Sequence, residues 1–499
     1  MLKSGKEHLQ KLRDGRVVYV GGELVFDVTS HPAFRNGARS LAGIFDLKFD
    51  SKHRETLTFQ EDGEVYSTHY LRPKTRDDLL KRMNAHKIIS DSTYGLFGRS
   101  PDHVSSFVTG MEMQADVLDG GTNKDRSYAK NLRDYYRYAR DNDLYIAYAV
   151  VPAPGARDQS FGGKRGDRTP ELRVIEETDE GVVVSGMKLL ATGSIFADEV
   201  WVGNLQPLAP DRKKEAITFA IPINTPGVTL WSRKPMEPTA ASEFDNPLSY
   251  RFDETDAIVM FDNVKVPWGR VFCHEDPILS RDMYYKTASH CFGNHQANIR
   301  FWSKLRLMVG LASEVARVSQ TDRIPAVREQ LGRFAALEGM LAGMIHGQCM
   351  NHENLGNGYV SINRRYMYGA LTWCTENYAE IVDKMRELMG GGVFMLPADI
   401  SIMKNEALKD TFEAYWGTGT VSATHRLKVF KLAWDLLGSE FGSRHWQYER
   451  FYAGPPYVVR DHSFREAPWE ELRGRVEELM ETYDISSHSS PAAPQVRSA

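Results

Sequence analysis

The segment at residues 94–107 ("YGLFGRSPDHVSSF") places two chemically capable side chains in apolar and aromatic surroundings. Arg99 stands between a glycine and a Ser-Pro pair, and His103 follows four residues later. A guanidinium is a permanent cation that favours nearby anions, and an imidazole accepts protons near neutral pH. This pair therefore marks a candidate site at which an anion is bound or made.

Motifs of several common enzyme classes do not occur in the sequence. There is no G-x-x-x-x-G-K-[ST], no G-x-G-x-x-G that opens a helix after a strand, no G-x-S-x-G and no H-E-x-x-H. These absences argue against P-loop, Rossmann and common hydrolase chemistry. The cysteines have no C-x-x-C spacing, which predicts buried free thiols and no metal site; they are Cys273, Cys291, Cys349 and Cys374.

Three further segments are suited to contact a ligand. The turn at residues 154–157 leaves an apolar stretch, Thr192 and Ser194 follow another, and three glycines occupy residues 390–392 after a helical pattern. Rigid turns and glycines let backbone approach a flat ring or a phosphate closely. Each segment also has an ordinary structural interpretation, as a surface turn, a β-turn and a helix stop, and both interpretations stay open.

The elements that must position these residues fall into successive blocks. Residues 1–145 are mainly helical in pattern, with helices expected at 77–91 and 125–141, whereas 146–278 show short strand patterns that predict a β-barrel domain. Residues 279–480 return to helical periodicity, with apolar faces within 327–344 and 427–441, and predict a helical bundle. Residues 481–499 are polar enough to predict a disordered tail.

Charge and hydropathy restrict the partners and the location. The 499 residues carry 62 Lys and Arg against 66 Asp and Glu, a net charge of −4, so neither nucleic acid nor an anionic membrane is an expected partner. The first twenty residues lack an apolar signal core, and no run of about 18 apolar residues occurs. We therefore expect a cytoplasmic protein.

The order of a helical domain, a β domain and a helical bundle is similar to that of the acyl-CoA dehydrogenase-like flavoproteins. This α+β resemblance implies a flavin between the β domain and the bundle, but fold alone does not give the chemistry. Apolar bundle faces of this kind often bury against copies of the same chain, so we also expect a homo-oligomer.

A closer resemblance rests on several long motifs that occur in order and at compatible spacing between about residue 4 and about residue 457. They are "SGKEHLQKLRDGRVVYVGGELVFDVTSHPAFRN", "YGLFGRSPD", "VVSGMKLLATGS", "NPLSYRFDETDAIVMFDNVKVPW" and "LKVFKLAWDLLGSEFGSRHWQYERFYAG". The chain resembles the oxygenase component of two-component 4-hydroxyphenylacetate 3-monooxygenases. It also resembles the wider group of chlorophenol and nitrophenol monooxygenases and natural-product tyrosine hydroxylases.

The resemblance implies an FADH2-dependent aromatic monooxygenase that hydroxylates a phenol ortho to its hydroxyl through a flavin C4a-hydroperoxide. Reduced FAD would come from a separate NAD(P)H:flavin reductase, O2 would be the co-substrate, and the oligomer would be a tetramer. A phenol is only about one part in a thousand ionised at pH 7. Arg99 matches the arginine of the family, which implies that it favours the more reactive phenolate.

Two positions of the implied site are exchanged relative to the family. Where the family has a tyrosine this chain has His103, and where the family has a histidine it has Tyr148. The resemblance then implies that the base has moved to His103 and that Tyr148 donates a hydrogen bond to substrate or flavin. The alternative is that His103 is structural and the pocket serves a different substrate.

Further positions differ within the implied substrate pocket. Leu205 and Gln206 lie where the phenylacetate enzymes have small polar residues that hold the substrate carboxylate, a role that Leu205 cannot fill. Asn294 lies where the chlorophenol enzymes have a histidine base, and His295 beside it is a possible substitute.

The flavin contacts implied by similarity use backbone and rigid turns, with Arg157 as a cation for the reduced ring or the pyrophosphate. They are Tyr148, Ala149, Val150, Pro154, Gly155, Ala156, Arg157, Thr192, Tyr452, Ala453, Gly454 and Pro455. The glycines at 390–392 would approach the flavin of a neighbouring subunit.

Other functions stay open at this point. The same flavin chemistry could serve para-dehalogenation, denitration or N-hydroxylation, and the fold also allows an acyl-CoA dehydrogenase or a non-catalytic binding protein. An acyl-CoA dehydrogenase needs a buried carboxylate base at the flavin, and none is assigned. The substrate, and whether it is free or tethered to a carrier, are not specified by the sequence.

Overall fold

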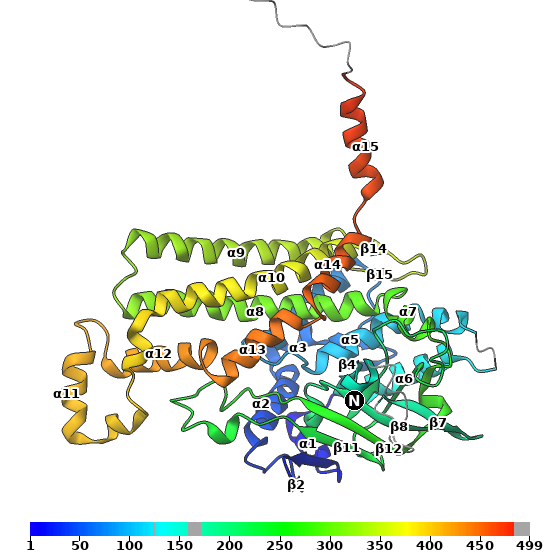
Figure 1. The fold of residues 1–499 in the computed structure, drawn as a ribbon, viewed down its shortest axis with the longest axis horizontal. Helices are drawn as coiled ribbons and strands as arrows, with labels where there is room; N and C mark the ends of the chain where they lie inside the picture. The colour runs from blue at the N-terminus through cyan, green and yellow to red at the C-terminus, as the bar shows by residue number, and fades with distance from the viewer. Residues whose placement is uncertain (123–124, 158–170, 484–499) are drawn as a thin grey trace, which may run out of the picture.

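The computed structural model describes residues 1–122, 125–157 and 171–483 (Figure 1). Its N-terminal part is mainly helical, and α4 and α6 confirm the helices predicted at 77–91 and 125–141. The helix α4 starts at a capping box in which Thr75 and Asp78 satisfy each other's backbone N–H. The elements of this part are α1 (Gly5–Lys11), α2 (Arg35–Asp46), α3 (Ser51–Leu57), the hairpin β3 (Thr58–Glu61) and β4 (Glu64–Ser67), α4 (Arg76–Ser92), α5 (Pro101–Glu112) and α6 (Tyr128–Asp141).

The middle part contains two sheets. One has seven strands in the order β2-β1-β11-β12-β8-β6, with β7 also paired to β8, and the other has the order β13-β10-β9-β5. The first sheet is built from β1 (Val17–Val20), β2 (Glu23–Val25), β6 (Val151–Pro152), β7 (Arg173–Glu177), β8 (Gly181–Leu189), β11 (Val228–Ser232) and β12 (Ala257–Pro267). The second is built from β5 (Ile146–Ala149), β9 (Glu199–Val202), β10 (Ile217–Pro222) and β13 (Val271–His274).

A strand from the N-terminal part completes the larger sheet. β1 pairs in parallel with β11, with Val17 opposite Thr229 and Val20 opposite Ser232. The β-branched run at residues 17–20 therefore finds its partner about 200 residues later in the chain. Closure of the sheets into a barrel and the domain limits 1–145, 146–278 and 279–480 stay predictions.

The C-terminal part is a helical bundle in which α8, α9 and α10 run side by side, while α15 extends away from the body (Figure 1). The predicted apolar face at 427–441 spans two helices, since Gly438 and Ser439 separate α12 from α13. The elements are α7 (Leu279–Tyr285), α8 (Ser289–Val318), α9 (Pro325–Met350), β14 (Glu353–Asn354), β15 (Val360–Ser361), α10 (Arg364–Met389), α11 (Glu406–Trp416), α12 (Ala423–Leu437), α13 (Glu440–Phe451), α14 (Pro456–Arg465) and α15 (Trp469–Met480).

The helix α8 organises the centre of the molecule. It packs against α4 and α5 of the N-terminal part and against α9, α10 and α12 of the bundle, and every residue from 289 to 301 is buried. Because buried polar groups need partners, several polar side chains of this stretch bond to neighbouring elements, among them His290 to Tyr368, His295 to Gln348 and Arg300 to Glu449. The predicted α+β class, with helical, β and helical parts in that order, is confirmed.

Three smaller expectations concern surfaces and termini. The four cysteines are buried free thiols, as predicted. No helix in the described part of the chain is long and apolar enough to cross a bilayer. Most of the predicted tail, residues 484–499, lies outside the described residues.

Candidate functional site

The loop that carries Arg99 joins α4 to α5 and is fixed by its backbone. The amides of Gly98 and Arg99 donate to Oε2 of Glu254 at 2.7 and 3.2 Å. A Cβ at Gly98 would lie 2.0 Å from the Tyr448 hydroxyl, and one at Gly95 would lie 2.3 Å from the Arg300 carbonyl oxygen. The two glycines therefore let this loop press against α13 and α8.

The guanidinium of Arg99 is half-buried and has neutral partners. Nη1 lies 2.5 Å from Nε2 of His103, and Nη2 donates to the Tyr452 carbonyl oxygen at 3.1 Å. The same group lies over the Tyr452 ring, 4.0 Å from its centroid. Within residues 1–122, 125–157 and 171–483, no carboxylate forms an ion pair with it. Its charge is therefore available to an anionic ligand.

His103 lies in the first turn of α5 and is fully buried. Burial, followed by the positive charges of Arg99 and Arg300, holds the pKa of the imidazole well below its usual value. The ring is therefore neutral at pH 7, and since Nε2 accepts from Arg99, the proton is assigned to Nδ1. Nδ1 is buried and has no hydrogen-bond partner in the described structure.

Tyr148, on β5, and His103 both pack against the Phe107 ring. The centroid of Phe107 is 5.1 Å from that of His103 and 5.3 Å from that of Tyr148. Burial, reinforced by the nearby phenol of Tyr284, raises the pKa of Tyr148, so its hydroxyl stays protonated. That hydroxyl makes no well-aligned hydrogen bond with a described residue. Phe107, which the sequence did not single out, thus connects the two exchanged positions.

Thr192 lies in a strained turn after β8. Its Oγ1 donates to Oδ1 of Asp256 at 2.6 Å, and the turn contains Leu190 and Gly193 at φ values of +57° and +75°. The hydroxyl oxygen of Ser194 is buried without a partner among the described residues. A cavity of about 770 Å³ adjoins this turn, lined in part by Leu189, Leu190, Trp231, Arg233 and Asp256. This turn therefore has a cavity beside it, and it carries the Ser194 hydroxyl, which has no hydrogen-bond partner among the described residues.

The other residues predicted to contact cofactor or substrate lie on β5 and in the segments that follow β5, β6 and β9. Ala149 is buried and its carbonyl oxygen accepts from the Gly203 amide at 3.3 Å. Val150 follows it, and the short 3₁₀ helix η4 (Pro154–Arg157) comes next. Leu205 is half-buried and Gln206 is exposed in the loop after β9.

The segment from Tyr452 to Pro455 connects α13 to α14. Tyr452 is buried, and its hydroxyl donates to the Gly98 carbonyl oxygen at 3.3 Å. Gly454 has a φ of +99°, a conformation that favours glycine, and Pro455 precedes α14. This segment and the Arg99 loop hold each other in place.

Glu254 and Asp256 connect the site to the bundle. Arg444, on α13, lies 2.9 Å from Oε1 of Glu254 and 2.7 Å from Oδ1 of Asp256. Thr255 between them has a φ of +61°, outside the usual range for such a residue. Burial alone would raise the pKa of Asp256, but Arg444 and Arg233 outweigh it and hold the pKa well below its usual range. The acidic run just before β12 was the sequence signal for this role.

A second buried charge cluster joins α13 to α8. Glu449 accepts from both Nη atoms of Arg300 and from Nζ of Lys304, which also lies 2.9 Å from Nδ1 of His445. Burial works to raise the pKa of Glu449, but the two cations lower it to about 2, while burial lowers the pKa of Lys304 to about 8. These contacts fix α13 to α8, and sequence reasoning missed them.

Comparison with known proteins assigns this arrangement to a family. The model of the 4-hydroxyphenylacetate 3-hydroxylase N terminal domain matches residues 4–273, and that of the C terminal domain matches residues 280–481. The chain belongs to the 4-hydroxyphenylacetate 3-hydroxylase family. The family indicated by the sequence motifs is therefore confirmed.

Relatives of this hydroxylase family match nearly the whole chain. The 4-nitrophenol 2-monooxygenase oxygenase component of Rhodococcus sp is 33% identical, over 98% of this chain and 94% of that protein. The 4-hydroxyphenylacetate 3-monooxygenase oxygenase component of Thermus thermophilus is 31% identical, over 97% and 99%. A crystal structure of the HpaB oxygenase component complexed with FAD and 4-hydroxyphenylacetate superposes with a TM-score of 0.89, at 29% identity over 96% and 98% of the chains.

Asn294 and His295, the positions considered for an alternative base, both lie on α8 and make internal contacts. Asn294 Nδ2 donates to the His290 carbonyl oxygen at 2.8 Å, and His295 Nδ1 lies 2.6 Å from Oε1 of Gln348. The His295 ring also faces His86 of α4. These side chains are engaged within the helical packing.

Gly390, at a φ of +55°, is the C-cap of α10, and its contact with a flavin stays a prediction.

Proposed function

We propose that this chain is the oxygenase component of a two-component, FAD-dependent aromatic monooxygenase that hydroxylates a phenol ortho to its hydroxyl. Its family supports the reaction class. The observation that carries the proposal is the half-buried guanidinium of Arg99, whose partners in the described structure are neutral and include the neutral imidazole of His103. Such a pair suits a ligand that binds as a phenol and reacts as a phenolate.

The residues around Thr192 fit a bound FAD. The buried hydroxyl groups of Ser194 and Tyr148 make no well-aligned hydrogen bond with a described residue, so they have capacity for polar atoms of a cofactor. Bound there, reduced FAD delivered by an NAD(P)H:flavin reductase would, with O2, supply an electrophilic oxygen atom for the aromatic ring. The residues proposed to hold FAD are Tyr148, Ala149, Val150, Pro154, Gly155, Ala156, Arg157, Thr192, Tyr452, Ala453, Gly454 and Pro455.

The proposed role of Arg99 and His103 is to ionise the substrate. An opposite charge in close contact lowers the pKa of a phenol by about 1 to 3 units from its usual value near 10. The phenol oxygen would replace the direct hydrogen bond between the two side chains, accepting from Nη1 of Arg99 while Nε2 of His103 takes its proton. The rings of Phe107 and Tyr452 would exclude water from this reaction.

The proposed assembly is a homotetramer. Large apolar side chains are exposed in the bundle, for example Met340 at 55%, Phe394 at 82% and Leu479 at 63%. Exposed apolar surface of this kind is typical of an interface. Leu479 lies on α15, which projects from the body of the protein (Figure 1). A cytoplasmic location also stays a prediction.

The test mixes the purified protein with anaerobically reduced FAD, adds oxygen and a panel of para-substituted phenols, and identifies products by mass spectrometry. We expect the gain of one oxygen atom ortho to the hydroxyl. A product that loses a halogen or a nitro group, or carries its new hydroxyl on nitrogen, would assign the chain to another branch of this chemistry. Reduction of FAD by an acyl thioester, with no aromatic product, would contradict the proposal.

A further inference from the structure

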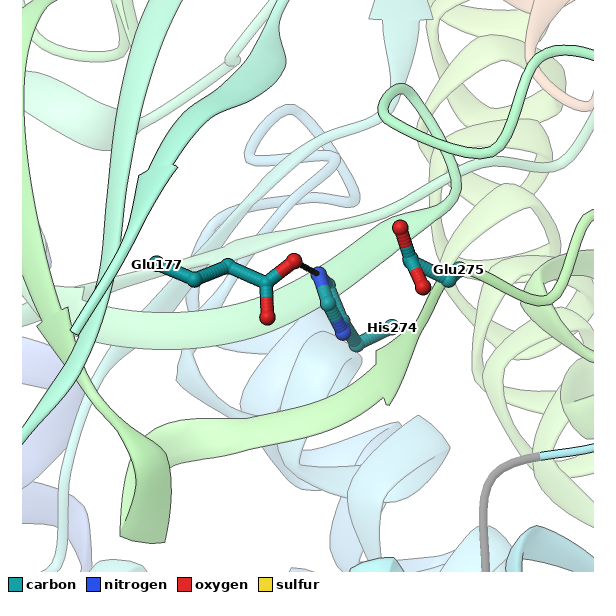
Figure 2. A group of neighbouring side chains, drawn as sticks. All are labelled: Glu177, His274 and Glu275. Carbon is teal, nitrogen blue, oxygen red and sulfur yellow. Dashed lines mark ion pairs between the residues drawn. The ribbon is translucent and has the colours of Figure 1, made fainter. Parts of the chain in front are cut away.

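A separate group of ligating side chains joins the ends of two strands. Glu177 is the last residue of β7, His274 is the last residue of β13, and Glu275 follows it. One ligand atom from each residue lies within 4.8 Å of the others. Figure 2 shows the carboxylate of Glu177 facing the His274 ring, with the carboxylate of Glu275 on the other side of that ring.

The backbone brings two neighbouring residues to the same place. Successive side chains of a strand point to opposite faces, so His274 and Glu275 would diverge if β13 continued. Glu275 instead has a φ of +56°, in the left-handed region, which ends the strand and redirects its side chain. The third ligand, Glu177, reaches the same point from a different sheet.

The imidazole of His274 has an unused nitrogen. The residue is 2% exposed, and Nε2 makes no hydrogen bond in the described structure, although Oε1 of Glu177 lies 3.4 Å away. This buried nitrogen is therefore a free ligand atom that lies within 4.8 Å of the carboxylate oxygens of Glu177 and Glu275. Among the described residues, neither Glu177 nor Glu275 forms an ion pair with a lysine or an arginine.

We propose that Glu177, His274 and Glu275 bind a divalent transition-metal ion, with Zn²⁺ as the preferred occupant. One imidazole nitrogen and two carboxylates are typical ligands of Zn²⁺, whereas Ca²⁺ and Mg²⁺ prefer oxygen ligands alone.

The bound ion would act as a structural cross-link. β7 pairs with β8 in the seven-stranded sheet, and β13 pairs with β10 in the four-stranded sheet. Zn²⁺ would therefore tie the two sheets together just before the chain enters α7 and the bundle. This role does not depend on the proposed function, because none of the three ligands belongs to the Arg99 or Thr192 groups.

Calorimetric titration of the metal-free full chain with Zn²⁺, Ca²⁺ and Mg²⁺ tests the proposal, with thermal unfolding as a second readout. We expect one Zn²⁺ per chain, bound at least ten times more tightly than Ca²⁺ or Mg²⁺, and a higher melting temperature in its presence. Glu177→Gln and Glu275→Gln should each weaken Zn²⁺ binding at least about tenfold, a loss of about 1.4 kcal/mol. The matched control Glu176→Gln changes an exposed neighbour on β7 and should leave the affinity unchanged.

Other results would overturn the site. If no Zn²⁺ binds at concentrations up to about 1 mM, the dissociation constant is too high for a specific protein site, and the proposed site is excluded. If Glu176→Gln and Glu177→Gln weaken Zn²⁺ binding equally, the ion is only attracted by the negative surface charge. If Ca²⁺ binds as tightly as Zn²⁺, the His274 nitrogen is not a ligand. Because both glutamates are exposed, their variants decide the question even if His274→Ala does not fold.

Discussion

Arg99 and Arg300 both pack against the ring of Tyr452, at 4.0 and 5.0 Å from its centroid, but their charges have different partners. Arg300 is fully buried and forms a two-armed ion pair with Glu449. Arg99 is half-buried, with an imidazole and a backbone carbonyl oxygen as its hydrogen-bond partners.

The difference separates a structural cation from one that is available to a ligand. A buried ion pair with complete hydrogen bonding has no capacity left for another anion, and its loss leaves an uncompensated charge. A cation with neutral partners can exchange them for a ligand at a smaller cost. Substitutions in the two groups should therefore affect different properties, stability at Arg300 and chemistry at Arg99.

The largest effect is expected from Glu449→Gln. This change leaves Arg300 and Lys304 buried without a counter-charge, so the free energy of unfolding should fall by about 3 to 5 kcal/mol. Urea unfolding followed by circular dichroism measures this loss. The control Glu440→Gln, at an exposed ion pair with Lys234, should change it by less than about 0.5 kcal/mol. If both variants lose the same free energy of unfolding, the buried charges of Arg300 and Lys304 do not depend on Glu449 as a counter-charge.

Arg99→Met should show the opposite pattern. Loss of the cation should lower the rate of phenol hydroxylation by about 10- to 1000-fold, because the bound phenol loses about 1 to 3 units of pKa depression. The midpoint of urea unfolding should stay close to that of the wild type. Single-turnover product formation with reduced FAD measures the rate, and a large loss of stability without a loss of rate would assign Arg99 to the structural class.

His103→Gln should lower hydroxylation by about 100-fold at pH 7 if His103 accepts the phenol proton. The pKa of His103 lies well below 6.5, so the wild-type base is neutral and its contribution is constant between pH 6.5 and 8. In the variant, the rate should instead rise with pH as more phenol ionises in solution. A pH profile of single-turnover rates checks this, and profiles of the same shape for both proteins would point to another base.

Stability should fall as the pH drops below 6.5. In the unfolded chain His103 takes up a proton near pH 6.5, whereas the buried ring stays neutral, so the unfolded state binds more protons in acid. At pH 5.5 this one residue costs up to about 1.4 kcal/mol relative to pH 8. Urea midpoints at the two pH values should show a smaller acid loss in His103→Gln than in the wild type. An identical loss would indicate that His103 is protonated in the folded protein.

The smallest effect on stability is expected from Tyr148→Phe. Its hydroxyl makes no well-aligned hydrogen bond, so removing it should change the free energy of unfolding by less than about 0.5 kcal/mol. Loss of a hydrogen bond to a ligand should still weaken binding of reduced FAD or substrate by about three- to tenfold. Fluorescence titration measures the affinity, and unchanged binding of both would assign Tyr148 to packing.

Much of the fold follows from local pattern. The helical spacing in 77–91 and 125–141 gave α4 and α6, and the β-branched run before Pro267 gave β12. Local pattern did not reveal that β1 pairs with β11, because strand pairing joins residues far apart in the chain and strand periodicity does not name the partner. Local pattern also predicted one apolar face at 427–441, although Gly438 and Ser439 divide this region into two helices.

The sequence by itself determined the family, the order of the parts and the candidate residues Arg99, His103 and Tyr148, because these depend on residue types and their spacing. Only the tertiary structure decided which charges are used internally. The carboxylates of Glu254 and Asp256 pair with Arg444, and that of Glu449 pairs with Arg300, from positions about 150 to 190 residues away. Arg99 is left with neutral partners because ion pairing depends on distances of a few ångströms, which only the folded chain sets.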